Sequence, residues 1–472
     1  MTTVKLRNVR SFSRAIRPVG IVVALVALLV PWFVEFPGLS DAGSRMFGIF
    51  LMAIVLWVTE AIPLHATATL IVLLEILLVS DKAFAVESIG DAPPFSTFFA
   101  AFAHPVIMLF LGGFFIAEGA AKFGFDRYLA KVMLRPFGTS TRLIMLGLMV
   151  ITAALSMFMS NTATTATLMA VIIPVIAGLP AGDRLKTGLA LSIPIAANIG
   201  GMGTPVGTPP NAIAVGSLGD SGYSVSFLQW MIVAVPIVVL LLVGAWWLLG
   251  RFYRSSSDRI DINIEASFDR SMSAMIFYVT FALTVVLWLT EPIHGISSSI
   301  VGFLPVVILL STRVFTTRDM QSIQWNVLWL VAGGIALGIG VGTSGLDDWL
   351  VSRINWTAIE PGLIIVVLAL IAVALSTVIS NSAATNLLMP IGLSLAISGG
   401  LGLSPVLVAF FIAVAASSAM ALPVSTPPNA IAYSTGVVKT KDMAVVGLAV
   451  GVVSLVLFFL IAPPIWSLLG VT

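Results

Sequence analysis

The sequence predicts an all-α polytopic membrane protein that is built as an inverted repeat, and three observations support this fold class. Of its 472 residues, 59% are hydrophobic and only 9% are charged, whereas soluble domains carry about 25% charged residues. Apolar runs long enough to span a membrane recur from one end of the chain to the other. Finally, the heptapeptide TPPNAIA occurs twice, at 208–214 and 426–432.

The apolar runs predict about 11 transmembrane helices and two re-entrant helical hairpins. Both hairpins, 143–181 and 360–397, are interrupted at their centres by polar residues. Non-helical backbone at membrane depth is tolerated where it lines a cavity, which favours hairpins over paired spans. Two full spans remain an alternative in each case, and they would return the chain to the same side. The predicted crossings are 19–35, 46–62, 64–80, 104–121, 187–217, 226–250, 272–291, 296–312, 325–343, 404–436 and 443–468.

The positive charges predict an orientation. Residues 1–45 form a basic terminus followed by a first helix that we interpret as uncleaved. With the N-terminus in the cytoplasm, 20 of the 23 Lys and Arg residues lie inside, and only Arg45, Lys82 and Arg353 lie outside. The positive-inside rule expects this bias. We therefore expect a multi-pass protein of a bacterial inner membrane, with its C-terminus outside. The chain has no cysteine, which excludes disulfides and thiolate metal sites.

The doubled heptapeptide belongs to a longer internal repeat. The segment 57–62 is echoed at 288–293, and Ser-Asn-Thr-Ala at 160–163 is echoed by Ser-Asn-Ser-Ala at 380–383. Five predicted crossings separate the two Ser-Asn motifs, so the halves have opposite orientations. Inverted repeats with broken helices at matching positions are typical of secondary transporters. The predicted divisions are an N-terminal segment and first helix (1–45), a first repeat (46–254), a cytoplasmic linker (255–271) and a second repeat (272–472).

The two Ser-Asn motifs have the chemistry of an ion-binding site. A helix break there leaves backbone N–H groups free at the start of the second half-helix, where an anion binds favourably. The carbonyls that end the first half-helix suit a small cation such as Na⁺. In both halves a serine, Ser156 or Ser376, lies one helical turn before the break. For the nearby threonines we leave a structural role open, as helix packing or back-bonding: Thr164, Thr165, Thr167 and Thr385.

The TPPNAIA motifs predict a second kind of helix break. Glycines and prolines interrupt the helices near 204–210 and 423–428, and the Pro-Pro pair suits the first turn of a restarted helix. Asn211 and Asn429 fall just inside the restart, where they are placed to tie down the loop. A proline kink for gating or packing is the alternative. We expect the carbonyls of the preceding residues to be free to face a site: Gly207, Thr208, Ser425 and Thr426.

Neither hairpin core nor helix break contains Arg, Lys or His. The charge of an anionic substrate there would be offset by helix termini, amide donors and bound cations, so cation coupling is the natural mechanism. Glu60 and Glu291 are repeat-related but close to the membrane boundary, which favours a structural role. Glu75 and Glu118 have no acidic counterpart in the other half.

In these motifs the chain resembles the divalent anion/Na⁺ symporter family, the INDY-type dicarboxylate transporters of the ion-transporter superfamily. The resemblance implies a homodimer in membrane lipid, with a scaffold and an elevator-type transport domain in each protomer. It also implies Na⁺-coupled import of small dianions such as succinate, malate and fumarate. No organic cofactor and no nucleic acid are expected.

The resemblance also assigns residues to sites. One Na⁺ site would use Ser156, Ser160, Asn161 and Gly207, and the second Ser376, Ser380, Asn381 and Ser425. The substrate would meet Asn161, Thr162, Asn381 and Ser382, with Thr208, Thr426 and Pro427 nearby. Dicarboxylate members often carry Thr where this chain has Ser382, so citrate, 2-oxoglutarate or sulfate remain alternative substrates.

Other functions are left open or disfavoured. A Na⁺-independent exchanger would be expected to place a basic side chain in the site, and an arsenite or Na⁺/H⁺ antiporter an acidic one. A channel would not need two pairs of broken helices, and an enzyme would need a nucleophile and base or metal ligands. The amphipathic stretches 122–142 and 347–354 are expected to be interfacial helices that anchor the scaffold.

Overall fold

Within the residues that it describes, the computed structural model consists of helices and connecting loops, with one isolated bridge between Ser140 and Arg259. It describes residues 2–84, 92–254, 259–260, 262, 264–353, 356, 359–398 and 400–470, with side chains from residue 17 onward except at 398. Parts of the predicted linker (255–258, 261 and 263) and residue 354 of a predicted interfacial helix lie outside the described residues.

The first half of the chain contains α1 (Thr2–Phe33), α2 (Asp41–Thr59), α3 (Leu64–Leu78), α4 (Phe95–Ala100), η2 (Ala101–Ala103), α5 (Pro105–Lys122), α6 (Phe125–Leu134), η3 (Arg135–Phe137), α7 (Thr141–Ser156), α8 (Asn161–Gly178), α9 (Leu185–Gly201), α10 (Pro209–Asp220) and α11 (Phe227–Phe252). The second half contains α12 (Met272–Leu289), α13 (Glu291–His294), α14 (Ser298–Ser311), α15 (Thr317–Ser322), α16 (Trp325–Thr343), α17 (Leu346–Ser352), α18 (Pro361–Val378), α19 (Asn381–Ser398), α20 (Pro405–Ser417), α21 (Pro427–Ser434) and α22 (Thr440–Leu468).

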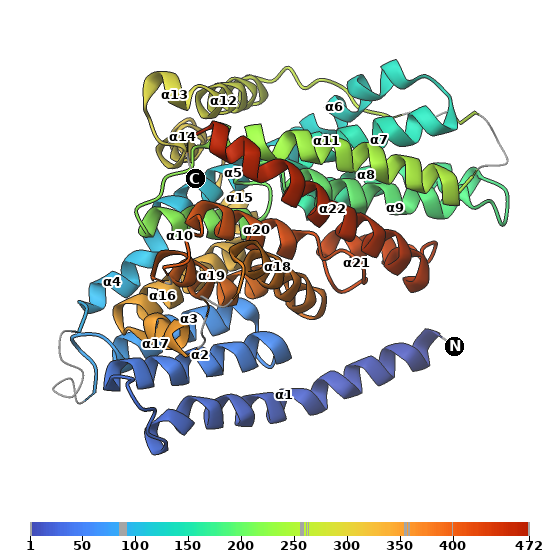
Figure 1. Cartoon of the computed structure of the whole chain (residues 1–472). Coiled ribbons are helices and arrows are strands. Elements are labelled where there is room, and N and C mark those ends of the chain that lie inside the picture. The colour runs from blue at the N-terminus through green and yellow to red at the C-terminus, as the bar shows by residue number, and fades with distance from the viewer. Residues whose placement is uncertain are drawn as a thin grey trace.

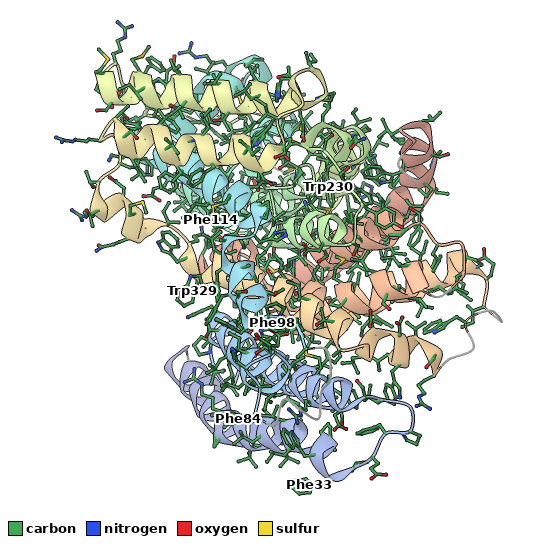
Figure 2. All side chains as sticks on the ribbon, turned by 90° about the vertical axis from the view of Figure 1, so that its left-hand side faces the viewer. Phe33, Phe84, Phe98, Phe114, Trp230 and Trp329 are labelled. Carbon is green, nitrogen blue, oxygen red and sulfur yellow. The ribbon has the colours of Figure 1, made fainter. Side chains whose placement is uncertain are left out.

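The predicted fold class is confirmed: the chain is an all-helical polytopic membrane protein. Within the described residues, 8 helices are long and apolar enough to cross a membrane, and shorter apolar helices accompany them. The outer surface is apolar, as lipid contact requires. Phe33 is 85% exposed, whereas Trp230 is fully buried, and Figure 2 shows Phe33 at the edge of the molecule and Trp230 well inside it.

The contacts between helices divide them into two groups; in Figure 1, α12 and α14 of the first group lie at the top and α1–α3 at the bottom. One group contains α1–α3, α5, α12, α14 and α16, in which α16 packs on α3 and α5 packs on α14. The other group contains the hairpin and broken helices, α7–α11 and α18–α22. The groups meet mainly where α16 and α17 contact α19 and where α5 and α16 contact α10.

The sequence repeat is also a repeat of packing. The contacts α7–α9 and α8–α9 in the first half recur as α18–α20 and α19–α20 in the second. The repeat-related Gly112 and Gly333 both allow close approach, since an added Cβ would overlap Gly302 in one case and Ala68 in the other. The repeated loops after α2 and α12 are tied in the same way, by the indole nitrogens of two fully buried tryptophans. Trp57 donates to the carbonyl of Leu64 at 3.3 Å, and Trp288 to that of Ser298 at 3.0 Å.

The short helices α6 and α17 begin at matching positions. Each follows a glycine in the left-handed region, Gly124 with φ 60° and Gly345 with φ 70°. These glycines turn the chain sharply at the end of α5 and of α16. The buried Asp126 of α6 accepts a hydrogen bond from Thr167 of α8 at 2.8 Å, so α6 contacts the hairpin directly.

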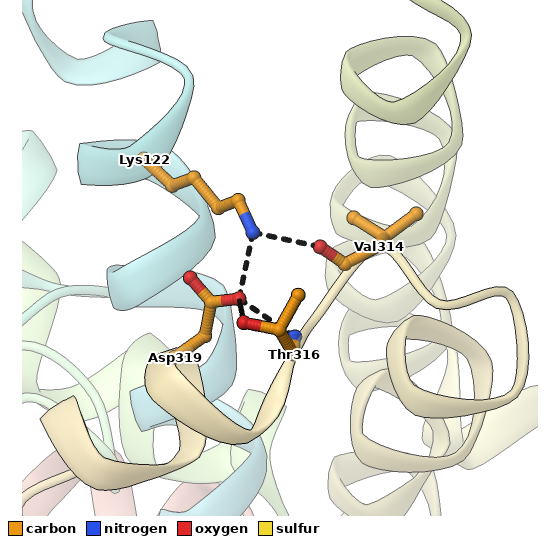
Figure 3. Close-up of polar contacts among 4 residues, drawn as sticks. All are labelled: Lys122, Val314, Thr316 and Asp319. Atoms are coloured by element: carbon orange, nitrogen blue, oxygen red, sulfur yellow. Dashed lines mark hydrogen bonds and ion pairs between the residues drawn. The ribbon is translucent and has the colours of Figure 1, made fainter.

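An ion pair fastens the end of α5 to the start of α15 (Figure 3). Lys122 Nζ lies 2.7 Å from Asp319 Oδ2 and donates to the carbonyl of Val314 at 2.8 Å. The same carboxylate oxygen accepts the backbone N–H of Thr316 at 2.7 Å. Partial burial raises the pKa of Asp319, but the hydrogen bonds from Lys122 and Thr316 outweigh it and lower the pKa below its ordinary value.

Candidate functional site

Both hairpins break at the predicted Ser-Asn motifs. In the first, α7 ends at Ser156 and α8 begins at Asn161; in the second, α18 ends at Val378 and α19 begins at Asn381. Ser156 and Ser376 are fully buried, whereas both asparagines are partly exposed. Each break therefore places a buried hydroxyl behind an accessible amide side chain.

Each buried serine lies between two other oxygen atoms. Ser156 Oγ contacts Asn161 Oδ1 and lies 2.9 Å from the carbonyl oxygen of Ala197 in α9. Ser376 Oγ lies 2.7 Å from Asn381 Oδ1 and 2.7 Å from the carbonyl oxygen of Ala416 in α20. We call these two sets the first and second oxygen clusters. Sequence reasoning predicted the serine and asparagine but missed the carbonyls, which come from another helix.

The oxygen clusters fit a hard cation. Each contains three oxygens but only one hydroxyl proton, so the serine cannot donate fully to both acceptors at once. Hard cations take hydroxyl, amide and backbone carbonyl oxygens as ligands. A cation among these oxygens would remove the competition for the single proton.

The other predicted cation ligands make different contacts in the two halves. In the first half, an added Cβ at Gly207 would overlap the carbonyl of Gly201, and a Cβ at Gly201 would lie 2.7 Å from the Asn161 amide. Gly201 and Gly207 therefore pack closely against each other, and Gly201 packs against Asn161 of the first cluster. In the second half, Ser380 Oγ accepts the N–H of Ala383 at 3.2 Å, and Ser425 Oγ contacts the carbonyl of Thr377 at 3.5 Å. The partly exposed Ser160 begins α8 as its N-cap residue.

The TPPNAIA motifs form the predicted helix restarts. Pro209 is the first residue of α10 and Pro427 the first residue of α21. The chain leaves the preceding helices after Gly201 and Ser417, so the second break starts earlier than its prolines predicted.

The asparagine of each motif holds its loop, as predicted. Asn211 Nδ2 lies 3.1, 3.3 and 2.8 Å from the carbonyl oxygens of Gly201, Met202 and Thr204. Asn429 Nδ2 lies 2.8 and 3.0 Å from those of Met420 and Leu422. A buried loop must satisfy its backbone carbonyls, and a side-chain amide with two N–H donors does this in each half.

One expectation about these loops was wrong. The carbonyls of Thr208 and Thr426 are not free, because they accept N–H bonds from Asn211 and Ala430, both at 3.2 Å. Each threonine already begins the new helix, and its carbonyl is used in the first turn.

Reciprocal hydrogen bonds join the two halves at these loops. Asn198 Nδ2 of α9 donates to Thr426 Oγ1 and Asn429 Oδ1, both at 3.2 Å. At the related place in the other half, Ser417 Oγ of α20 lies 3.2 Å from Thr208 Oγ1. Asn198 follows Ala197 of the first cluster and Ser417 follows Ala416 of the second. Each oxygen cluster is therefore one residue away from a contact with the opposite TPPN loop.

The predicted substrate residues lie around these contacts. Thr162 and Ser382 are the second residues of α8 and α19, in the first helical turn, where backbone N–H groups lack partners within the helix. Thr208 lies beside Asn161, since both approach Gly201. Pro427 follows Thr426 at the start of α21, which packs on α8. Within the described residues, the structure connects the two Ser-Asn motifs through α9, α20 and the TPPN loops, with no hydrogen bond between them.

Most of the remaining polar candidates form hydrogen bonds that hold the fold together. Thr167 bonds Asp126, and Thr385 Oγ1 donates to the carbonyl of Asn381 at 2.8 Å. Glu291 accepts the N–H groups of Phe227 and Ser298 at 3.2 and 3.3 Å. Glu75 is fully buried beside Gly340 of α16, and no hydrogen-bond partner for it is found in the described part of the chain.

Comparison with known proteins places this arrangement in a family. A sequence profile described as "Sodium:sulfate symporter transmembrane region" matches residues 16–472. The chain belongs to the sodium:sulfate symporter family, the divalent anion/Na⁺ symporters. It is therefore a membrane transporter of a sodium-coupled anion class and not an enzyme, as the sequence motifs predicted.

Named relatives match over most of their length. The chain is 31% identical to the sodium-dependent dicarboxylate transporter SdcS of Staphylococcus saprophyticus, with 90% of this chain and 87% of the relative covered. It is 30% identical to SdcS of Staphylococcus aureus, covering 88% and 85%.

Solved structures share the fold. The YdaH transporter of Alcanivorax borkumensis superposes with a TM-score of 0.57 at 15% identity, covering 91% of this chain and 99% of that one. MtrF of Neisseria gonorrhoeae gives 0.53 at 12% identity, covering 85% and 94%.

Proposed function

We propose that this protein is a secondary active transporter that imports C4-dicarboxylates, such as succinate, malate and fumarate, by Na⁺-coupled symport. The observation that carries the proposal is the pair of repeat-related oxygen clusters, each beside the amino end of a half-helix. The names of the SdcS relatives support both the ion and the substrate class.

The clusters support two Na⁺ sites. Ser156, Asn161 and the Ala197 carbonyl would hold one ion, and Ser376, Asn381 and the Ala416 carbonyl the other. Ser160 and Gly207, and Ser380 and Ser425, are the further ligands that we propose for the two sites. Hydroxyl, amide and carbonyl oxygens are ligands that suit such a hard cation.

The helix starts support a dianionic substrate. The first turns of α8 and α19 offer backbone N–H groups and the positive ends of two helix dipoles, and each also carries a hydroxyl, Thr162 or Ser382. Two such ends match the two carboxylates of a C4 dianion. Bound Na⁺ ions would supply the positive charge that side chains do not, which makes anion binding dependent on the cation.

The packing supports an elevator mechanism. The hairpins and broken helices pack chiefly among themselves, as α7–α11 and α18–α22, and meet the group around α1–α3, α12 and α16 mainly through α10 and α19. We propose that the group of hairpins and broken helices moves across the membrane as one body against the group around α1–α3, α12 and α16. We further propose a homodimer in a bacterial inner membrane, with the N-terminus in the cytoplasm.

Uptake of radiolabelled succinate into proteoliposomes tests the proposal. An inward Na⁺ gradient is compared with an inward choline gradient, for the unaltered protein and for Asn161→Ala and Asn381→Ala. We expect concentrative uptake only with Na⁺ and its loss in both variants. Asn326→Ala is the matched control, since this asparagine is exposed at the start of α16.

Other results would identify the alternatives. Uptake that ignores Na⁺ but requires internal dicarboxylate would indicate an exchanger with the same site. Absence of succinate uptake under both gradients, with Na⁺-driven uptake of citrate, 2-oxoglutarate or sulfate, would retain Na⁺ coupling and reject the C4 substrate.

A further inference from the structure

A cationic cavity lies apart from the transport site, where α7 and α9 begin and α11 ends. Its volume is about 520 Å³, within the range of about 300–1,000 Å³ that is typical of small-molecule sites. Its walls include Arg142, Arg251, Arg254, Trp246 and Trp247. The start of α7 and the end of α11 lie on the right-hand side of Figure 1, the side on which the first helix begins.

Three arginine side chains bring positive charge to the cavity wall. All three arginines are exposed, and no carboxylate among the described residues lies within ion-pair distance of them. Asp442 accepts a hydrogen bond from Tyr253 Oη of the cavity wall at 3.1 Å, and it forms no ion pair with these arginines. In the described part of the chain, three guanidinium groups around one cavity therefore have no ion-paired carboxylate, which suits an anionic ligand.

A hydrogen bond and a glycine of the wall fix the shape of the cavity. Trp246 Nε1 donates to the backbone carbonyl of Arg142 at 2.9 Å, which fixes the start of α7 against the last turns of α11. An added Cβ at Gly250 would meet no atom within 4 Å, so this glycine leaves open space in the cavity wall. The arginines thus surround a space that the described residues do not fill.

An exposed apolar stripe on α11 leads to this cavity. On α11, Leu240, Val243 and Trp247 are 49%, 48% and 65% exposed, and Arg251 follows one turn later. The spacing places the four on one helix face. Tryptophan prefers the membrane–water boundary, so we expect the arginines at headgroup level and the stripe at the depth of acyl chains.

We propose that this cavity binds the phosphate group of an anionic phospholipid, with an acyl chain along the exposed stripe of α11. Guanidinium groups bind phosphate oxygens through paired, charge-assisted hydrogen bonds, and basic pockets between membrane helices suit anionic headgroups. Soluble phosphate shares this chemistry, but it does not use the apolar stripe. Such a lipid contacts both α7 of the first hairpin and α11, so it stabilises the packing of these two helices against each other.

Lipid binding to the purified full-length protein tests this assignment. Thermal unfolding in detergent is measured with added dioleoylphosphatidylglycerol, with dioleoylphosphatidylcholine, or with inorganic phosphate at matched ionic strength. Native mass spectrometry counts the lipids retained. We expect phosphatidylglycerol alone to raise Tm and to remain as a bound adduct.

Two kinds of variant locate the effect. The triple variant Arg142→Gln, Arg251→Gln, Arg254→Gln removes the charge, and its affinity for phosphatidylglycerol should fall about tenfold or more because charged hydrogen bonds are the strong ones. Gly250→Phe fills the cavity, keeps every charge and should lose the adduct as well. The matched control Arg270→Gln, Arg313→Gln, Arg318→Gln makes the same charge change at exposed positions predicted on the same side and should keep the adduct.

Three results would overturn the assignment. Equal stabilisation by phosphatidylcholine would show that the headgroup charge is irrelevant. An unchanged phosphatidylglycerol adduct in Gly250→Phe and in the triple variant would place the lipid elsewhere. A Tm increase from inorganic phosphate as large as that from phosphatidylglycerol, lost in the triple variant, would show a soluble-anion site in place of a lipid site.

Discussion

Replacing Asn211 by alanine should loosen the helix break that begins α10. Asn211 is fully buried, and its amide nitrogen satisfies carbonyls of the loop between α9 and α10. Two N–H donors give about two hydrogen bonds, which contribute about 0.6 kcal/mol each in membrane proteins. The carbonyls left buried without a donor cost about 1–3 kcal/mol more. We therefore expect a loss of about 2–4 kcal/mol of stability.

The predicted loss is measurable by thermal unfolding in detergent. An unfolding entropy of about 2.1 cal/mol/K per residue gives about 1 kcal/mol/K for 472 residues, so Tm should fall by about 2–4 °C. Asn429→Ala in the other half should behave alike, and the exposed Asn326→Ala should leave Tm unchanged. A Tm for Asn211→Ala equal to that of the Asn326 control would refute the role given to the repeated asparagine.

Three further predictions concern the clusters and the acidic side chains. Ser156→Ala and Ser376→Ala should each raise the Na⁺ concentration for half-maximal succinate uptake several-fold, and normal Na⁺ dependence in both would argue against the oxygen clusters. The pKa of Asp319 is lowered because the hydrogen bond from Lys122 outweighs partial burial. The ionised Asp319 carboxylate therefore stabilises the fold at pH values above the ordinary pKa of aspartate. Asp319→Asn should lower Tm near neutral pH, and the difference from the unaltered protein should disappear as the pH falls through the lowered pKa. Burial raises the pKa of Asp347, so its ionisation opposes folding once the pH exceeds the ordinary pKa of aspartate. Asp347→Asn should therefore raise Tm near neutral pH and leave Tm unchanged in acid. The same change of Tm at all pH values would contradict this role of Asp347.

The sequence could predict the features that are local or repeated. The prolines of TPPNAIA indicate a helix restart by themselves, because proline lacks an N–H and fits the first helical turn. The Ser-Asn breaks are recognisable because polar residues interrupt apolar runs in both halves. Asn211 and Asn429 were predicted to hold their loops because each follows the prolines at the same spacing.

Long-range partners could not be predicted in the same way. The carbonyls of Ala197 and Ala416 carry no side-chain signal, and only the packing of α9 and α20 brings them to the serines. Asn198 bonds a threonine 228 positions away, and one sequence does not reveal such a pairing. Its one visible signal is a lone amide in an apolar helix, which must find a partner when buried.

The movement of Na⁺ itself tests the central claim most directly. Entry of radioactive sodium into proteoliposomes is measured with and without an inward succinate gradient, for the unaltered protein and for Asn161→Ala and Asn381→Ala. Symport predicts that succinate drives Na⁺ entry in the unaltered protein and that both variants lose the stimulation. Succinate uptake without any accompanying Na⁺ entry would contradict the assignment of the oxygen clusters as coupled Na⁺ sites.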